Sequence, residues 1–164
     1  MGTVPSGAAP VTAQEAPAAL LRPLPALDAL IDSGPLLALF NRRDRWHAPT
    51  LAWLQAHPQV RLHSTWPVLT EVCALLARRI HNDAALDFLQ WVQLGAVQLD
   101  APAEWSLTSL LVILRRFADL PLDLADASIA EAAERRGIRH VVSIDQDFDV
   151  YRNAKGQALV NLLR

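Results

Sequence analysis

Residues 27–41 read LDALIDSGPLLALFN, and this stretch predicts the fold class of the chain. The apolar run from Ala29 to Ile31 indicates a buried strand, and it stops at an acid, Asp32. We expect Ser33 to cap a helix that has Pro35 in its first turn and an apolar face of leucines. In a parallel sheet, binding sites form just beyond the carboxyl ends of the strands, where Asp32 would lie.

Strand-like and helix-like patterns alternate through the rest of the chain. Further strands are expected over 60–63, 96–99, 140–144 and 158–163, and helices over 45–57, 67–80, 82–94, 102–117 and 122–136. Asn82 is expected to cap one helix and Gly95 to end it. This order predicts an α/β fold, a three-layer sandwich whose central, mostly parallel sheet of four or five strands is flanked by helices.

Composition limits the class of protein. The 164 residues suffice for one domain, which we place over 27–164, after a flexible Ala/Pro-rich extension over 1–26. The net charge of -2 means that any contact with nucleic acid must come from a local basic patch. Cys73 is the only cysteine, which excludes an intramolecular disulfide and a cysteine metal cluster.

The apolar content bears on localisation and on partners. No uncharged apolar stretch reaches the ~18 residues of a membrane helix, so we do not expect the chain to enter membranes. The first residues do not show the pattern of a secretory signal and Cys73 is the only cysteine, so we expect a cytoplasmic protein. Apolar residues nevertheless make up 52% of the chain, and its mean hydropathy is +0.17. For a chain of this size, these values favour apolar surface that a partner or a second copy covers.

Four acids occupy strand ends or helix starts in this predicted order. Asp32 ends the first strand, and Asp145 ends the strand over 140–144. Glu71 and Asp126 lie in the first turns of two helices. Because parallel strands end at one rim of the sheet, the four carboxylates are expected to meet there.

Such a meeting would be unfavourable without a counter-charge. Two carboxylates about 5 Å apart repel by roughly 3 kcal/mol at an effective dielectric near 20. Several such pairs rival the ~5–15 kcal/mol that stabilises a whole domain. A divalent cation would relieve the repulsion, and a ligand set of oxygens alone suits Mg²⁺ or Mn²⁺. The alternative is that each acid only caps a helix or interacts with its dipole.

Five short stretches resemble the PIN-domain ribonucleases, in particular the VapC toxins of bacterial toxin–antitoxin pairs. They are LIDSGPLLAL over 30–39, DRWH over 44–47, VLTEV over 68–72, FADLPLDLADA over 117–127 and VSIDQDF over 142–148. Each stretch alone is a weak indicator of the family. The five stretches in this order are a specific indicator, and together they span most of the predicted domain.

The resemblance implies a role for each matching acid. It makes Asp32, Glu71, Asp126 and Asp145 the catalytic, metal-binding carboxylates, and Asp147 could replace or assist Asp145. Ser33 and Ser143 stand where the family often has threonine, so they would support a carboxylate or a water. Asp123 departs from the family pattern and is interpreted as a supporting helix cap.

The resemblance also implies an activity and partners. It predicts a Mg²⁺-dependent endoribonuclease, the toxin of a type II toxin–antitoxin system, in which a metal-activated water cleaves RNA. A cognate antitoxin and a homodimer are implied, with Leu51, Leu54, Leu69, Leu75 and Leu76 as candidates for an antitoxin groove. Arg42, Arg43 and Arg45 follow the first helix and are candidates for binding RNA phosphates.

Two other readings stay open. The chain could be a PIN-domain nuclease of RNA processing that has no antitoxin. It could also be a catalytically inactive module that binds RNA or protein.

Overall fold

The core of the protein is a five-stranded sheet. The computed structural model describes residues 26–101, 106–120 and 122–164, so the extension expected over 1–26 lies almost entirely outside the described residues. The strands are β1 (Leu27–Ile31), β2 (Val60–Thr65), β3 (Gln98–Asp100), β4 (His140–Val142) and β5 (Val160–Asn161). They stand in the order β3-β2-β1-β4-β5, and each neighbouring pair is parallel. The predicted α/β class with a parallel sheet is therefore confirmed.

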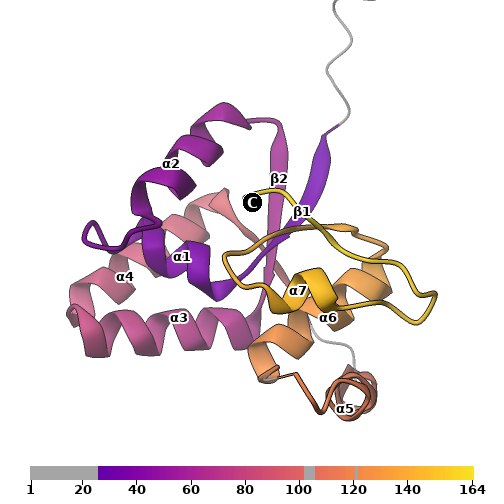
Figure 1. The fold of residues 1–164 in the computed structure, drawn as a ribbon. Coiled ribbons are helices and arrows are strands. Elements are labelled where there is room, and N and C mark those ends of the chain that lie inside the picture. Colours follow the sequence, from indigo (N-terminus) through magenta and orange to yellow (C-terminus); the bar gives the residue numbers. More distant parts are fainter. Residues whose placement is uncertain (1–25, 102–105, 121) are drawn as a thin grey trace, which may run out of the picture.

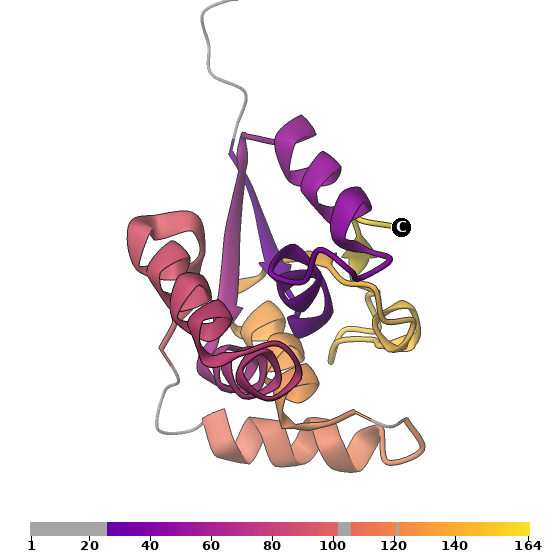
Figure 2. The same ribbon diagram turned by 90° about the vertical axis from the view of Figure 1, so that its left-hand side faces the viewer.

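Helices cover both faces of this sheet. They are α1 (Ser33–Leu39), α2 (His47–Ala56), α3 (Trp66–Arg79), α4 (Asn82–Trp91), α5 (Ser106–Arg116), α6 (Leu124–Arg136) and the short α7 (Asp147–Val150). Helices α1 to α4 lie on one side of β1 and β2, and α5 and α6 lie on the other (Figure 1). Figure 2 shows the same arrangement from the side of α1 to α4, with the two strands crossing the middle of the molecule.

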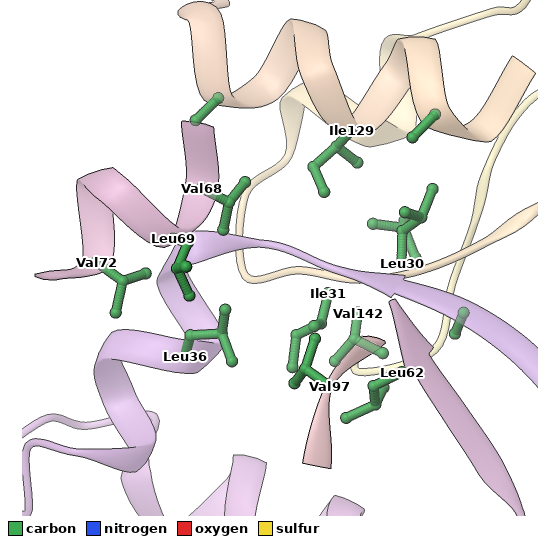
Figure 3. Close-up of a cluster of buried hydrophobic side chains, with 14 of the residues drawn as sticks. Leu30, Ile31, Leu36, Leu62, Val68, Leu69, Val72, Val97, Ile129 and Val142 are labelled. Atoms are coloured by element: carbon green, nitrogen blue, oxygen red, sulfur yellow. The ribbon is translucent and has the colours of Figure 1, made fainter. Parts of the chain in front are cut away.

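The central strand β1 is buried on both faces. Successive side chains of a strand point to opposite sides of the sheet. Leu30 accordingly lies toward Ile129 of α6, whereas Ile31 lies on the other side, near Val142 and toward Leu36 of α1 (Figure 3). A strand that is covered twice needs apolar residues in succession, which is why this part of the sequence is apolar throughout.

The ends of several elements differ from the sequence predictions. Asp32, and not Ser33, caps α1: its Oδ1 accepts a hydrogen bond from the Ser33 amide at 2.6 Å. Asn82 makes no cap, since it is already the first residue of α4. A wide helical turn (Val92–Ala96) follows α4 and contains Gly95 at φ 92°, a conformation that glycine adopts without strain.

The last third of the chain shows further differences. The helix expected over 102–117 is described from Ser106, because residues 102–105 lie outside the described residues. Strand β4 ends at Val142, two residues earlier than expected, and β5 is only Val160–Asn161. The sequence pattern did not predict α7, whose four residues are too few to show a helical period.

A group of buried charges attaches α6 to the sheet. Arg135 of α6 donates to Glu131 one turn earlier, at 3.0 Å, and to Asp100 at the end of β3. Glu131 is only 5% exposed and Asp100 9%, so both carboxylates need a counter-charge, which Arg135 supplies to both and Arg136 also supplies to Asp100 at 3.4 Å. These pairs raise the pKa of Arg135 above its already high ordinary value, chiefly through the bond to Glu131.

Candidate active site

The sheet order creates a crevice beside β1. The chain runs from β1 outward to β2 and β3 on one side, and β4 and β5 lie on the other side of β1. The connections after β1 and β4 therefore diverge, and ligands of open parallel sheets bind at such a point. Asp32 directly follows β1, and Asp145 follows β4 by three residues. These two acids stand at opposite sides of the crevice.

A pocket of about 610 Å³ occupies this rim. It is lined by Asp32, Ser33, Gly34, Glu71, Asp123, Asp126, Ile144, Asp145, Gln146 and Asp147. The four acids that the sequence singled out thus share one pocket, together with Asp123 and Asp147. No lysine, arginine or histidine is among these lining residues, so the pocket concentrates negative charge.

Asp32 is the most buried of these carboxylates and is held in a fixed orientation. It is 3% exposed, and its two oxygens accept from the Ser33 amide at 2.6 Å and from the Ser143 hydroxyl at 2.9 Å. The Ser143 hydroxyl in turn accepts from the amide of Asp145 at 2.9 Å. Ser143 therefore links the acid after β1 to the acid after β4. Ser33 contributes its backbone amide to this arrangement.

Asn161 of β5 positions Ser143, and the sequence analysis missed it. Its amide nitrogen donates to the Ser143 carbonyl at 2.9 Å, and its amide oxygen accepts from the Ser143 backbone N–H at 3.3 Å. The oxygen also accepts from the Leu163 amide at 3.1 Å. The only sequence signal was an asparagine inside an apolar edge strand, where asparagine is normally depleted.

Asp126 and Asp123 form a capping box at the start of α6. The Asp123 side chain accepts from the amides of Ala125 and Asp126, at 2.7 and 3.0 Å, and the Asp126 side chain accepts from the Asp123 amide at 3.1 Å. The interpretation of Asp123 as a helix cap agrees with this geometry. The same geometry leaves the other Asp126 oxygen free of the box, on a residue that lines the pocket.

Three of the carboxyls bind protons more tightly than isolated aspartates. Burial raises the pKa of Asp32 to about 6; the Ser143 and Ser33 donors oppose this shift, and the charges of Asp145 and Glu71 add to it. Burial likewise raises the pKa of Asp126 to about 7, with the charges of Asp32, Asp123 and Asp145 adding to it. The pKa of Asp147 is raised by burial and by Asp145. Crowded, desolvated carboxyls of this kind favour a proton or a cation.

Gly34 allows α1 to approach the segment that carries Asp145. A methyl group at this position would lie 2.6 Å from Cγ1 and 2.8 Å from Cδ1 of Ile144, much closer than carbon atoms normally approach. The glycine is therefore explained by close packing beneath the pocket.

The donor chemistry of the pocket fits a hard divalent cation. Its side chains offer carboxylate and hydroxyl oxygens, the ligands that Mg²⁺ and Mn²⁺ prefer. Within the described residues, however, no three acidic, histidine or cysteine side chains are already grouped so as to hold a metal ion. The pocket gathers the ligands, and the cation's charge would be needed to draw them closer.

The other residues singled out in the sequence lie elsewhere. Arg42 and Arg43 line a separate pocket at the far end of α1, and Arg45 lines neither pocket. Of the leucines considered for an antitoxin groove, Leu69 and Leu76 are core residues, because α3 turns them toward the sheet. Leu75 does line an apolar groove of about 740 Å³ that includes Trp66 and Leu124 and shares Glu71 and Asp123 with the carboxylate pocket.

In the part of the chain that the structure describes, every helix is too short or too polar to cross a bilayer.

The chain is similar to a known protein family in sequence and to solved structures in fold. A family model described as the PIN domain matches residues 29–154. No curated protein sequence matches the chain. Among solved structures, the fold is similar to Mycobacterium tuberculosis VapC20, described as a toxin that cleaves the sarcin-ricin loop. The TM-score is 0.68 at 21% identity, over 74% of this chain and 93% of that one.

A second similar structure is VapBC2 from Rickettsia felis, solved bound to a DNA fragment from its promoter. Its TM-score is 0.56 at 12% identity, over 76% of this chain and 92% of that one. At these identities the two structures establish a common fold.

Proposed function

The chain belongs to the PIN-domain family, and on this premise we propose that it is a Mg²⁺-dependent endoribonuclease, the toxin of a type II toxin–antitoxin pair. One observation carries the proposal: Asp32, Glu71, Asp126 and Asp145, from four separate segments, line a single pocket at the carboxyl rim of the sheet. A helix cap or a dipole contact explains one acid at a time. It does not explain why four acids from separate segments line one pocket whose lining residues include no basic side chain.

The four carboxylates are the ligands that we assign to the cation, with Asp147 as an additional one. When bound, Mg²⁺ or Mn²⁺ lowers the pKa of a water and neutralises charge that develops on a phosphate. The protein's own contribution is orientation: Ser143 and the Ser33 amide hold Asp32, and Asp123 holds Asp126. Oxygens fixed in this way need little reorganisation when charge develops during a reaction.

The proposed partners follow from the surface. The apolar groove of Trp66, Leu75 and Leu124 adjoins the carboxylate pocket, and an amphipathic helix of an antitoxin would cover it and block access to the pocket. One of the similar structures, VapC20, is described as a toxin, and the other is described as VapBC2 bound to a fragment of promoter DNA. Helix α5 carries exposed apolar side chains, Leu107, Leu111 and Val112, which we assign to contact with a second copy in a cytoplasmic homodimer.

Cleavage of total RNA by the purified chain, with Mg²⁺ or with EDTA, tests the proposal. We expect cleavage only with the metal, and ends that carry a 5′-phosphate and a 3′-hydroxyl. Asp126→Asn should lower the rate by at least about 100-fold, because a weaker ligand replaces a charged one. Asp119→Asn is the matched control, since Asp119 is exposed and lies outside the pocket.

Undiminished cleavage by both Asp32→Asn and Asp126→Asn would end the nuclease proposal. The toxin assignment has its own test, which is growth arrest on expression. Rescue by the product of a neighbouring small reading frame would support an antitoxin, and arrest without any rescue would favour a nuclease of RNA processing.

A further inference from the structure

The carboxylate pocket alone cannot attract its proposed substrate. Six of its lining residues are acidic and the chain has a net charge of -2, whereas RNA carries one negative charge per nucleotide. Affinity for a nucleic acid backbone comes mainly from arginine and lysine. If the proposed function holds, a basic surface should therefore lie near the carboxylates.

One pocket combines several arginines. It has a volume of about 580 Å³ and is lined by Phe40, Asn41, Arg42, Arg43, Arg79, Ile80, His81, Ala84 and Asp87. Three arginines face one aspartate there, and His81 adds a further cation when it is protonated. Below, these lining residues are called the arginine pocket. Arg79 comes from the end of α3, so the sequence offered no reason to group it with Arg42 and Arg43.

The loop that carries Arg42 and Arg43 is fixed by packing. The Phe40 ring makes edge contacts with Phe88 and Trp91 of α4, at centroid distances of 5.5 and 5.7 Å. The Asn41 side chain accepts from the Arg43 backbone N–H at 3.2 Å and shapes the following turn. A loop held in this way loses little entropy when a ligand binds.

These arginines are available for a ligand. Arg61, Arg135, Arg136 and Arg164 pair with carboxylates of the protein. Among the described residues, no carboxylate forms an ion pair with Arg42, Arg43 or Arg79, and all three are exposed. Their guanidinium groups can therefore bind phosphate oxygens in bidentate fashion.

Two helices connect the arginine pocket to the carboxylate pocket. Helix α1 begins at Ser33 in one pocket and ends just before Phe40 in the other, and α3 carries both Glu71 and Arg79 (Figure 1). At 1.5 Å per residue, either helix separates the two pockets by about 10–12 Å. That spacing suits one RNA strand that reaches both pockets.

We propose that the arginine pocket binds the phosphate backbone of the RNA strand whose scissile bond lies in the carboxylate pocket. The proposal rests on the nuclease function and identifies a positioning site for its substrate. It assigns Arg79 to RNA binding beside Arg42 and Arg43, and it leaves Arg45 outside the site.

Binding of RNA without cleavage tests this site. A short single-stranded RNA labelled with fluorescein is titrated with the full chain in EDTA, and fluorescence anisotropy is followed between about 50 and 200 mM salt. For Arg42→Ala/Arg79→Ala, the slope of log affinity against log salt should fall by about 1.4, since each phosphate contact on a single strand contributes about 0.7. The corresponding loss of affinity near 0.1 M salt is roughly 20-fold.

Two further variants separate this site from general charge and from misfolding. Arg115→Ala/Arg139→Ala removes two exposed arginines that lie outside both pockets and should change neither slope nor affinity. Arg42→Lys/Arg79→Lys keeps the charges and should retain most of the slope while losing the bidentate contacts.

Each outcome decides the question. Equal affinity and slope for the wild type and Arg42→Ala/Arg79→Ala would overturn the proposal. An acidic segment of a protein would then remain as the candidate ligand of the arginine pocket. Equal losses in the control pair would also overturn it, because the effect would then be one of overall charge. If binding depends on the arginine pocket but the wild type cleaves no RNA with Mg²⁺, the pocket stands and the nuclease function fails.

Discussion

Replacing Asp32 by asparagine should stabilise the protein at neutral pH while abolishing the proposed nuclease activity. Asp32 is 3% exposed, and its pKa is raised from 3.8 to about 6, first of all by burial. The folded state therefore binds this proton more tightly than the unfolded state does. The stability contributed by the protonated group is present below pH 4 and is lost as the pH rises from about 4 to about 6.

The magnitude follows from the pKa difference. About two pKa units correspond to about 3 kcal/mol, which the ionised carboxylate costs above pH 6. Asparagine removes that cost, but it offers one acceptor where Asp32 offers two, to the Ser33 amide and the Ser143 hydroxyl. One lost hydrogen bond costs about 1 kcal/mol. The variant should therefore be about 2 kcal/mol more stable at high pH and about 1 kcal/mol less stable at low pH.

Denaturant unfolding in EDTA, from about pH 4 to pH 8, measures both limits. The free energies of unfolding of the wild type and Asp32→Asn should cross between these limits. Thermal unfolding should show a melting temperature about 4–8 °C higher for the variant at the alkaline end. Adding Mg²⁺ at about 100 times its dissociation constant should stabilise the wild type by about 2.7 kcal/mol and the variant by much less.

Asp119→Asn provides the control, because an exposed substitution should change the stability by less than about 0.5 kcal/mol at any pH. A constant destabilisation of Asp32→Asn across the whole pH range would refute the reasoning. It would mean that ionisation of Asp32 does not destabilise the folded state.

Three further outcomes are expected from single substitutions. Ser143→Ala removes the hydroxyl between Asp32 and the segment after β4, so metal affinity measured by calorimetry should fall about 10–100-fold, and an unchanged affinity would contradict its positioning role. Gly34→Ala places a methyl group 2.6 Å from Ile144 and should lower stability by about 1–3 kcal/mol in denaturant unfolding, whereas a neutral result would show that Ile144 can move aside. Arg135→Ala removes the arginine that pairs with buried Glu131 and leaves buried Asp100 with only the longer ion pair to Arg136. It should cost about 3–5 kcal/mol in the same assay, and a loss below about 1 kcal/mol would count against the ion network.

Much of the fold was predictable because its signals are local. The apolar run that ends at Ile31, the helical spacing of leucines after it and Gly137 at the end of α6 each act within a few residues. The acids after β1 and β4 could be recognised by the same local reading, since each directly follows a strand pattern. Where a segment is too short to show a periodic pattern, as in the four residues of α7, the sequence did not predict the helix.

The acids of the candidate site were predictable, and the resemblance also indicated Ser143 and Asp123 as supporting residues, but the contacts that hold Ser143 in place were not predictable. Neither the bond between Ser143 and Asp32 nor the contact of Asn161 with Ser143 leaves a trace in sequence spacing, because 111 and 18 residues separate the partners. The close approach of Gly34 to Ile144 and the placement of Arg79 beside the loop after α1 likewise join residues that are far apart in the sequence.

The sequence by itself therefore determined the order of strands and helices and the acids at their ends, because backbone geometry turns a local pattern of apolar and polar residues into a strand or a helix. Only the tertiary structure decided which of these ends meet. The placement of β4 beside β1 brings the acids together, and the packing of α1 against α3 brings Arg79 beside Arg42 and Arg43. Such meetings depend on how whole elements pack, and packing is set by contacts between residues that are far apart along the chain.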